Sequence, residues 1–332
     1  MRAVLIHRYG GPETMQLAER PAPKPGPRDV LIEVRAASLN PIDFKLRDGK
    51  SKLALPMAFP IGLGCDVAGV VREVGAEVKR LRPGDEVYAR LEKDRMGGLA
   101  EQVAADESVV AIKPPSLSFE EAAAVPLAAL TALQALREAA GLQAGQRVLV
   151  HAGAGGVGSF ALQIARILGI WTATTCSGRN VEFVRELGAD EVIDYTQADP
   201  AATLSGLDAV FDTLGGDSEL ASARLVKPGG VVVGVSGLPD TEFARAWLPL
   251  WVRPILWLLT LRRRWVYARL GVRYHYHFMR PDAGNLDELR GWIEAGKLRP
   301  VLHQVFALED FRAAFAELER GRSRGKIVVR IS

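Results

Sequence analysis

Three glycines, Gly153, Gly155 and Gly158, follow a short apolar run and have the spacing of a phosphate-binding turn. G-x-G-x-x-G spacing allows a tight turn at the first glycine, close approach of the backbone to a pyrophosphate at the second, and close packing of helix on strand at the third. Residues 148–150 are typical of a buried strand, and 159–168 have apolar residues at helical spacing, although glycine-rich turns without a ligand are also common. A dinucleotide phosphate would lie against the first N–H groups of that helix. The residues expected there are Ala154, Gly155, Gly156 and Val157.

The segment 174–180 favours a phosphorylated dinucleotide. Domains that bind NAD place an acid about 20 residues past the glycines, where it holds the ribose hydroxyls. This segment has no acid and offers instead the hydroxyl of Ser177, the guanidinium of Arg179 and the amide of Asn180. An acid would repel a 2′-phosphate, whereas the planar fork of an arginine can donate two hydrogen bonds to it. The segment therefore predicts NADPH over NADH, the alternative being a surface loop whose arginine points to solvent.

A second group of polar residues lies in 38–49, where Asn40, Asp43 and Lys45 follow one another closely. This segment is more polar than a core strand tolerates, and Asn40 before Pro41 favours an extended or turn conformation. The residues alone leave open whether the segment is a solvated loop or part of a site.

The elements that position these residues fall into two parts. Residues 1 to about 120 contain short strand-like runs (3–7, 30–36, 67–74 and 86–89) separated by proline and glycine turns, which is typical of a compact, barrel-like domain. Two helices are expected at 120–124 and 127–139. Strands and helices then alternate: strands at 170–175, 191–193, 208–212 and 231–235, helices at 181–187 and 220–225. This alternation predicts a parallel sheet with helices on both faces.

The C-terminal third has a last strand at 273–279, a helix at 285–295, and a closing strand at 325–331 that is expected to return to the first domain. Before it, residues 240–272 contain four tryptophans among leucines, prolines and the basic run Arg262–Arg264. Its apolar run is too short to span a bilayer. A lid over a substrate pocket or a subunit interface is favoured for this segment, because both bury aromatic side chains, and a basic amphipathic helix on an anionic membrane surface is the alternative.

Composition limits the remaining possibilities. A chain of 332 residues with 48% apolar and 24% charged residues is expected to form about two globular domains. The net charge of +3 gives no indication of nucleic-acid binding. Two cysteines and an N-terminal apolar run too short for a signal peptide predict a cytoplasmic protein.

Seven short motifs together resemble the medium-chain dehydrogenase/reductase superfamily, in particular its zinc-independent quinone oxidoreductase branch, over essentially the whole chain. They are Asn40–Asp43, Gly64–Gly69, Arg82–Val87, Pro126–Thr131, Ala154–Gly158, Leu187–Asp190 and Gly325–Lys326. The run 38–49, with Tyr195 after the third strand, is most similar to reticulon-interacting oxidoreductases, and its Asn-Pro-x-Asp-x-Lys pattern is also similar to alkenal/enone reductases.

The resemblance implies an α/β protein with a GroES-like β-rich catalytic domain (1–120 with 280–332) and a doubly wound Rossmann domain (121–279), with the nucleotide held in the cleft. It also implies a set of cofactor-binding residues: Asn40 and Thr131 near the nicotinamide, Ser177 and Tyr195 at the adenosine half, Ser236, Phe278 and Met279 on the nicotinamide side, and Lys326 at the phosphates.

The same resemblance argues against a metal. Zinc alcohol dehydrogenases have a cysteine where this chain has Asn40, and a His-Glu pair where it has Cys65 and Asp66. A catalytic zinc needs three protein ligands, and His275 with His277 would have no third ligand near them in the sequence.

The hypothesis is hydride transfer from NADPH to a quinone or an α,β-unsaturated carbonyl compound, with Asn40 and Lys45 stabilising the developing oxyanion. Asp43, Tyr274, Tyr276 and solvent are the candidate proton donors. Two alternatives stay open: an NADPH-binding regulatory or membrane-associated protein with low turnover, and a metal-free alcohol or aldehyde oxidoreductase. The expected partners are a small-molecule substrate and a second copy of the chain, joined through the strand at the sheet edge; contact with a membrane surface through 240–272 is left open.

Overall fold

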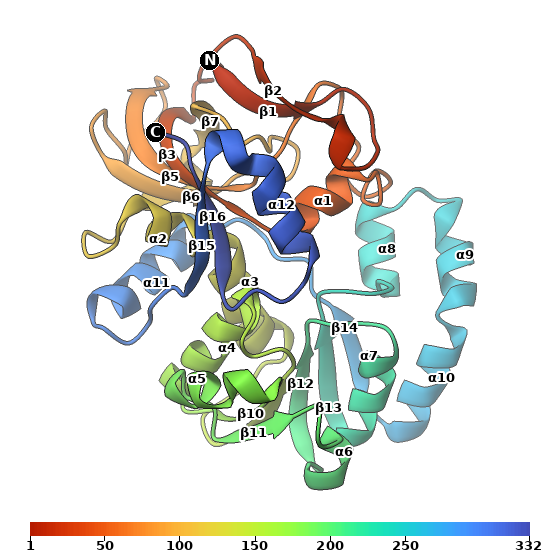
Figure 1. Cartoon of the computed structure of the whole chain (residues 1–332). Helices are drawn as coiled ribbons and strands as arrows, with labels where there is room; N and C mark the ends of the chain where they lie inside the picture. Colours follow the sequence, from red (N-terminus) through yellow and green to blue (C-terminus); the bar gives the residue numbers. More distant parts are fainter. The chain divides into compact units, whose positions relative to one another are not determined.

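The computed structural model describes all 332 residues, and the chain divides into two compact units (Figure 1). Unit 1 combines Met1–Leu130 with Arg280–Ser332, and unit 2 is Thr131–Met279. The sequence placed the first boundary at residue 120, whereas the structure places it inside helix α3 (Pro126–Gln134). The first turn of α3 belongs to unit 1 because the backbone N–H of Leu127 donates to the buried carboxylate of Asp66, at 3.0 Å.

Unit 1 is built around the long strand β3 (Asp29–Leu39), which pairs with three other strands. Its main sheet has the order β15 (Leu302–Ala307), β16 (Lys326–Arg330), β3, β5 (Asp66–Val74), β6 (Glu86–Arg90) and β8 (Val110–Ile112), with β7 (Gln102–Asp106) also on β3. A smaller sheet joins β2 (Met15–Glu19), β1 (Arg2–Ile6) and β4 (Ile61–Gly62). Four helices complete the unit together with the start of α3: α1 (Pro41–Arg47), α2 (Phe119–Ala123), α11 (Ala283–Glu294) and α12 (Phe311–Glu319). The GroES-like β-rich domain expected from the resemblance is confirmed.

The polar segment 38–49 contains a short helix, which was not predicted from the sequence. The segment Pro41–Arg47 is helix α1, and Asn40 is its extended N-cap residue, at φ −137° and ψ 155°. The carboxylate of Asp43 accepts a hydrogen bond from the backbone N–H of Asn40 at 2.7 Å. Proline at the first helical position and an acid at the third are helix-start signals that the sequence offered.

The closing strand β16 returns to unit 1, as expected, and this return creates part of the polar site. β16 pairs antiparallel with β3, with Ile327 opposite Leu39. This register brings Lys326, at the start of β16, next to Asn40, at the end of β3.

Unit 2 has a six-stranded parallel sheet of order β11-β10-β9-β12-β13-β14. The strands are β9 (Arg147–Val150), β10 (Trp171–Cys176), β11 (Glu191–Asp194), β12 (Leu207–Asp212), β13 (Val226–Gly234) and β14 (Arg273–Tyr276). Numbered along the chain, this order is 3-2-1-4-5-6, the arrangement of dinucleotide-binding domains. Val148, Leu149 and Val150 on the central β9 are fully buried. The doubly wound Rossmann domain is confirmed.

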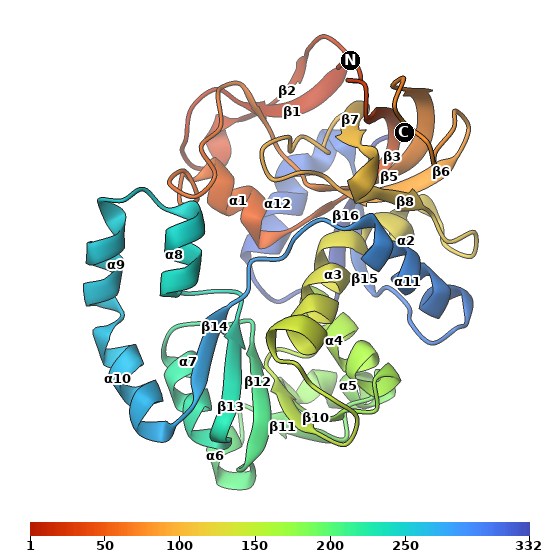
Figure 2. The same cartoon turned by 180° about the vertical axis from the view of Figure 1, so that it is seen from behind.

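Helices α4 (Gly156–Ile167), α5 (Val181–Glu186), α6 (Pro200–Thr203) and α7 (Asp217–Ser222) connect consecutive strands of this sheet. Between β13 and β14 the chain forms three more helices, α8 (Thr241–Trp247), α9 (Val252–Leu259) and α10 (Leu261–Leu270). Figure 2 shows β12, β13 and β14 side by side, with α9 and α10 outside the sheet. None of the helices has both the length and the apolar character needed to cross a membrane.

Candidate functional site

The glycine turn between β9 and α4 is packed so closely that two of its positions exclude a side chain. A Cβ on Gly158 would lie 2.3 Å from the carbonyl oxygen of Ala152, so the close helix–strand contact expected at this glycine is present. A Cβ on Gly153 would lie 2.1 Å from the hydroxyl oxygen of Thr174. The residue with positive φ in the turn is Ala152, at 53°, whereas Gly153 does not have a positive φ. Gly153 is therefore required by the approach of Thr174 on β10 rather than by the turn itself.

The four residues expected at the phosphates lie where α4 begins. Gly155 is the N-cap residue, and no side chain caps the N–H groups of the first turn. A Cβ on Gly155 would meet only the carbonyl oxygen of Ala152, at 3.3 Å. Uncapped N–H groups at the positive end of a helix are a binding arrangement for phosphate.

A buried histidine, which the sequence analysis did not single out, fixes this turn to its neighbours. The ring of His151 contacts the hydroxyl of Thr175 through Nδ1 (3.1 Å) and the hydroxyl of Ser222 through Nε2 (2.8 Å). Ser222 donates its own proton to the carbonyl oxygen of Ser218, so it accepts from Nε2, and Nδ1 accepts from Thr175. Burial lowers the pKa of His151 and keeps the ring neutral. The histidine thus holds the end of β9 between β10 and α7.

The loop after β10 contains the residues expected at the adenosine half. The amide of Asn180 donates to the hydroxyl of Ser177 at 3.2 Å, and Arg179 is exposed. Tyr195, just after β11, is 61% exposed. The structure also places an acid here that local sequence could not show, since a Cβ on Gly178 would lie only 2.6 Å from Asp194 Oδ2. Asp194 reaches the loop because β11 pairs with β10 and sets Asp194 opposite Cys176.

The residues expected on the nicotinamide side of unit 2 lie at the carboxyl ends of its strands. Ser236 follows β13, and Phe278 and Met279 follow β14. The ring of Phe278 packs edge-on against Phe243 and Trp247 of α8, with centroid distances of 5.2 and 5.0 Å. These contacts connect the end of the sheet with the helices that follow β13.

In unit 1, Asn40 lies at the centre of a buried polar cluster. Its amide donates to the carboxylate of Asp66 at 2.9 Å and reaches the sulfur of Cys65 at 3.5 Å. The side-chain amide oxygen of Asn40, Oδ1, accepts a hydrogen bond from the ammonium of Lys326. Lys326 also donates to the carbonyl oxygen of Leu39 at 3.0 Å and lies 3.7 Å from the Asp66 carboxylate. The amide of Asn40 is therefore held in one orientation from both sides.

Asp43 is fully buried beside this cluster and accepts from two backbone N–H groups, those of Asn40 (2.7 Å) and Gly64 (3.2 Å). Burial raises the pKa of Asp43 to about 7, although the hydrogen bond from Asn40 opposes the shift. Asp43 therefore helps to position Asn40, because its two carboxylate oxygens accept hydrogen bonds from the backbone N–H groups of Asn40 and Gly64.

The two lysines of the predicted site differ in their surroundings. Lys326, expected at the phosphates, is only 4% exposed and is bound within the Asn40 cluster. Lys45, on α1, is half-buried, and its ammonium forms no hydrogen bond or ion pair within the chain. Burial, with a smaller contribution from Lys50, lowers the pKa of Lys45. Asn40, Asp43 and Lys326 are thus brought together, and Lys45 stands apart with its donors available.

Two family models match this chain: the alcohol dehydrogenase GroES-like domain at residues 26–115 and the zinc-binding dehydrogenase at residues 187–329. The mitochondrial NAD(P)H oxidoreductase RTN4IP1 of Danio rerio is 35% identical over 100% of this chain and 91% of its own. The 2-methylene-furan-3-one reductase of Solanum lycopersicum is 36% identical over 99% of this chain and 79% of its own. The solved quinone oxidoreductase of Escherichia coli, complexed with NADPH, matches at a TM-score of 0.85 and 25% identity, with 100% of both chains covered. The chain belongs to the zinc-independent quinone oxidoreductase branch of the medium-chain dehydrogenase/reductase superfamily.

Although one matching family model is described as zinc-binding, the donor set of this quinone oxidoreductase family member does not fit a zinc ion. A catalytic zinc needs three protein ligands with free lone pairs. Asn40 faces Cys65 and Asp66 with its N–H groups, as a donor. Both oxygens of Asp66 already accept hydrogen bonds, one from Leu127 and the other from Ser38 and Asn40. Burial raises the pKa of the Cys65 thiol.

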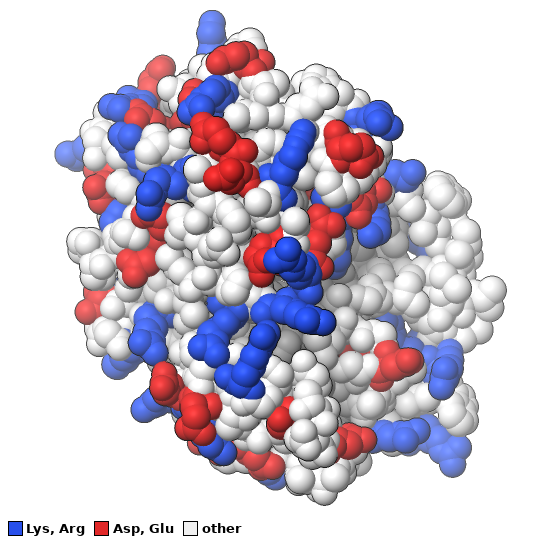
Figure 3. All heavy atoms as spheres, in the orientation of Figure 1, with Lys and Arg blue, Asp and Glu red and all other residues white.

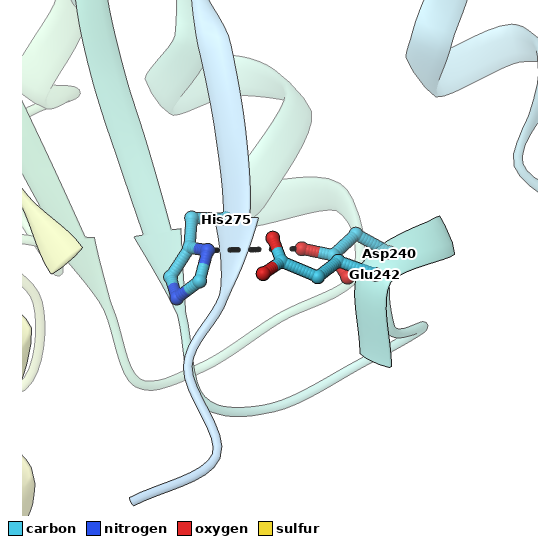
Figure 4. Close-up of side chains that lie close together, drawn as sticks. All are labelled: Asp240, Glu242 and His275. Atoms are coloured by element: carbon cyan, nitrogen blue, oxygen red, sulfur yellow. Dashed lines mark ion pairs between the residues drawn. The ribbon is translucent and has the colours of Figure 1, made fainter. Parts of the chain in front are cut away.

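A second group of residues whose types could hold a metal ion lies in unit 2, and local hydrogen bonds explain why these residues lie close together. Ligand atoms of Asp240, Glu242 and His275 lie within 4.8 Å of one another (Figure 4). The oxygens of Asp240 accept from the backbone N–H groups of Phe243 and Tyr276, each at 2.8 Å, and so cap α8 and tie it to β14. His275 Nδ1 lies 3.9 Å from Asp240. From the sequence, His275 and His277 were considered as a pair of metal ligands, whereas in the structure His275 lies beside the carboxylates of Asp240 and Glu242. Because both carboxylate oxygens of Asp240 already accept hydrogen bonds from the backbone, we assign no metal to this group.

The expected cytoplasmic location is contradicted by several relatives that are named as mitochondrial or chloroplastic proteins. The inference failed because a low cysteine content indicates only the redox state of a compartment. It carries no information on which reducing compartment holds the protein.

Proposed function

We propose that this oxidoreductase transfers hydride from NADPH to a quinone or an α,β-unsaturated carbonyl compound without a metal ion. The observation that carries the proposal is the glycine turn with an uncapped α4 behind it, in a sheet of 3-2-1-4-5-6 order. The relatives named as NAD(P)H oxidoreductase and 2-methylene-furan-3-one reductase support the cofactor and the class of acceptor.

The residues that would hold NADPH follow from the loops of unit 2. Backbone N–H groups of Ala154–Val157 would bind the diphosphate at the positive end of α4. Ser177, Arg179 and Asn180 would bind the 2′-phosphate, and the exposed ring of Tyr195 would cover the adenine. Those proposed at the nicotinamide end are Asn40, Thr131, Ser236, Phe278 and Met279. Lys326 keeps a cofactor role only indirectly, by orienting the amide of Asn40.

The cofactor supplies a hydride when bound, and the protein must stabilise the carbonyl oxygen of the acceptor as it gains negative charge. We assign this role to Lys45, because its ammonium is half-buried and has no partner within the chain. A cation in a partly dry environment interacts more strongly with a developing oxyanion than one in water. The Asn40 amide contributes less to this step, since it already donates to Asp66.

A substitution at Lys45 tests this function. Replacing Lys45 with Met should lower kcat roughly 100-fold, or about 3 kcal/mol in the transition state, with the KM for NADPH little changed. Lys52→Met is the matched control, because Lys52 is exposed and takes no part in lowering the pKa of Lys45. The measurement is the loss of NADPH absorbance with quinones, enones, aldehydes and alcohols as acceptors. Equal turnover in both variants would remove Lys45 from the mechanism, and oxidation of NADPH by none of the acceptors would refute the proposed function.

We also propose a homodimer formed through β14, which lies at one edge of the unit 2 sheet. An edge strand presents unpaired N–H and C=O groups that a second copy can satisfy. Sedimentation equilibrium of the wild type and of a β14 variant, Tyr274→Pro, should show a dimer and a monomer respectively; a monomeric wild type would refute the proposal.

A further inference from the structure

Helix α9 and its flanks expose an unusual number of large apolar side chains. Six residues leave more than half of their surface exposed: Leu250, Trp251, Ile255, Leu258, Leu259 and Trp265. We call these six the α9 patch. Figure 3 shows an uncharged surface over α9. Monomeric soluble proteins rarely expose contiguous apolar patches of this kind unless the patch binds something.

The sequence stretch that carries the α9 patch has basic side chains and no acidic ones. Between Glu242 and Asp282 the sequence contains no Asp or Glu. The same stretch contains eight arginines: Arg245, Arg253, Arg262, Arg263, Arg264, Arg269, Arg273 and Arg280. Figure 3 shows basic side chains over α10, directly beside the uncharged surface.

Two of these arginines are placed against the tryptophans of the segment. The guanidinium of Arg264 lies 5.2 Å from the ring centre of Trp257, and that of Arg269 lies 5.3 Å from that of Trp265. A tryptophan beside an arginine is suited to the boundary between lipid chains and headgroups, where the ring is half in water and the cation meets phosphate.

The inner side of the same helices is firmly anchored, so the α9 patch is held outward. Leu256 and Tyr267 are 6% and 4% exposed, and the hydroxyl of Tyr267 donates to the carbonyl oxygen of Glu219. Arg263 donates to the carbonyl oxygen of Pro239 at 2.8 Å and stacks 4.0 Å from the ring centre of Tyr274. The apolar side chains therefore do not reach the core of unit 2, which α10 contacts with its other side.

A cavity lies between α8 and α9, next to the α9 patch. It has a volume of about 310 Å³ and is lined in part by Arg245, Arg253 and Trp257. Arg253 is fixed by hydrogen bonds to the carbonyl oxygens of Leu248 and Arg245, and the guanidinium of Arg245 has no partner within the chain. A site with two guanidinium groups and a tryptophan can accept one phosphate headgroup.

We propose that the α9 patch docks this protein on a bilayer that contains anionic phospholipid, with α9 in the plane of the headgroups. Apolar burial and attraction of the arginines to lipid phosphate act together in such binding. In-plane binding fits the helices, since none can cross a membrane. A second copy of the chain fits less well, because a two-fold interface would set this acid-free, arginine-rich segment against itself. The proposal does not depend on the identity of the acceptor.

The test is flotation of the full chain with vesicles of phosphatidylcholine alone, and with vesicles of equal parts phosphatidylcholine and phosphatidylglycerol. We expect binding to the anionic vesicles only, weakening as salt is raised. Two variants should lose binding: Leu258→Ser with Leu259→Ser, and Arg262→Glu with Arg264→Glu. Their matched controls, Leu53→Ser and Arg8→Glu, change exposed residues of unit 1 and should bind like the wild type.

Fluorescence gives a second readout, because four of the six tryptophans lie between residues 247 and 265. Lipids brominated near the headgroup should quench this fluorescence in the wild type. Absence of flotation with anionic vesicles would overturn the proposal. A change in oligomeric state in the patch variants, without a change in flotation, would overturn it in favour of a subunit interface. A change in the KM for the acceptor in vesicle-free buffer, with flotation unchanged, would overturn it in favour of a lid.

Discussion

Replacing Lys326 with Met should destabilise unit 1 far more than an exposed lysine would. The ammonium donates to the carbonyl oxygen of Leu39 and to the amide oxygen of Asn40, and it lies 3.7 Å from the carboxylate of Asp66. Asp66 is fully buried, so methionine at position 326 would remove the ammonium that forms an ion pair with this buried carboxylate. Breaking a buried ion pair by removing one partner costs about 3–5 kcal/mol. This loss is a large fraction of the stability of a typical domain.

The assay is urea unfolding near neutral pH without cofactor, with Lys50→Met as the control. Lys50 forms the same kind of ion pair, with Asp48 at 2.9 Å, but its side chain is 66% exposed, against 5% for Lys326. Exposed pairs contribute about 0–1 kcal/mol, so the two variants should differ by at least about 2 kcal/mol. If Lys326→Met costs no more than Lys50→Met, the cluster around Asn40 is not the buried network described here.

Three other predictions address the turn, the buried acid and the cofactor. Gly158→Ala should weaken nucleotide binding and lower stability by about 1–3 kcal/mol, since the added Cβ would lie 2.3 Å from the carbonyl oxygen of Ala152. The control is Gly291→Ala, at a helical position with open space, which should raise stability by about 0.5–1 kcal/mol. Denaturant unfolding distinguishes the two variants. The pKa of Asp43 is raised from 3.8 to about 7, so the stability linked to its proton, up to about 4 kcal/mol, is full below pH ~4 and is lost as the pH rises through ~7. The unfolding free energy of the wild type should therefore fall with pH over this range, and the fall should be absent in Asp43→Asn. An unchanged pH dependence in the variant would contradict the assignment. Arg179→Ala should raise the Kd for NADPH roughly 10- to 100-fold and leave that for NADH unchanged by calorimetry, while an equal effect on both would show that Arg179 does not contact the 2′-phosphate.

The strand–turn–helix pattern around the glycines was predictable because it depends on local sequence. Strand β9 and helix α4 lie close to the predicted 148–150 and 159–168. Helix α1 was missed although Asn40, Pro41 and Asp43 formed a local start signal, because the polarity of the segment indicated only a solvated loop or part of a site. Strand β15 and helix α12 were also not predicted.

The partners within the site could not be predicted from local sequence. Lys326 reaches Asn40 only through the register of β16 on β3, a contact across nearly the whole chain. Asp194 likewise reaches the loop after β10 through the pairing of β10 with β11. The pattern around position 179 showed no acid because the acid comes from the next strand. Side-chain types and spacing indicate the chemistry available, and long-range strand register decides which groups meet.

The position of β16 has a consequence for the order in which the protein is made. Residues 326–330 fit between β15 and β3, so the sheet of unit 1 contains segments from both ends of the chain. The ribosome releases unit 2 as one continuous stretch, which can acquire its fold while the C-terminal residues are still being added. Unit 1 must keep β3 without one neighbour until residues 326–330 have been made, and during that interval the edge of β3 is open to other nascent chains.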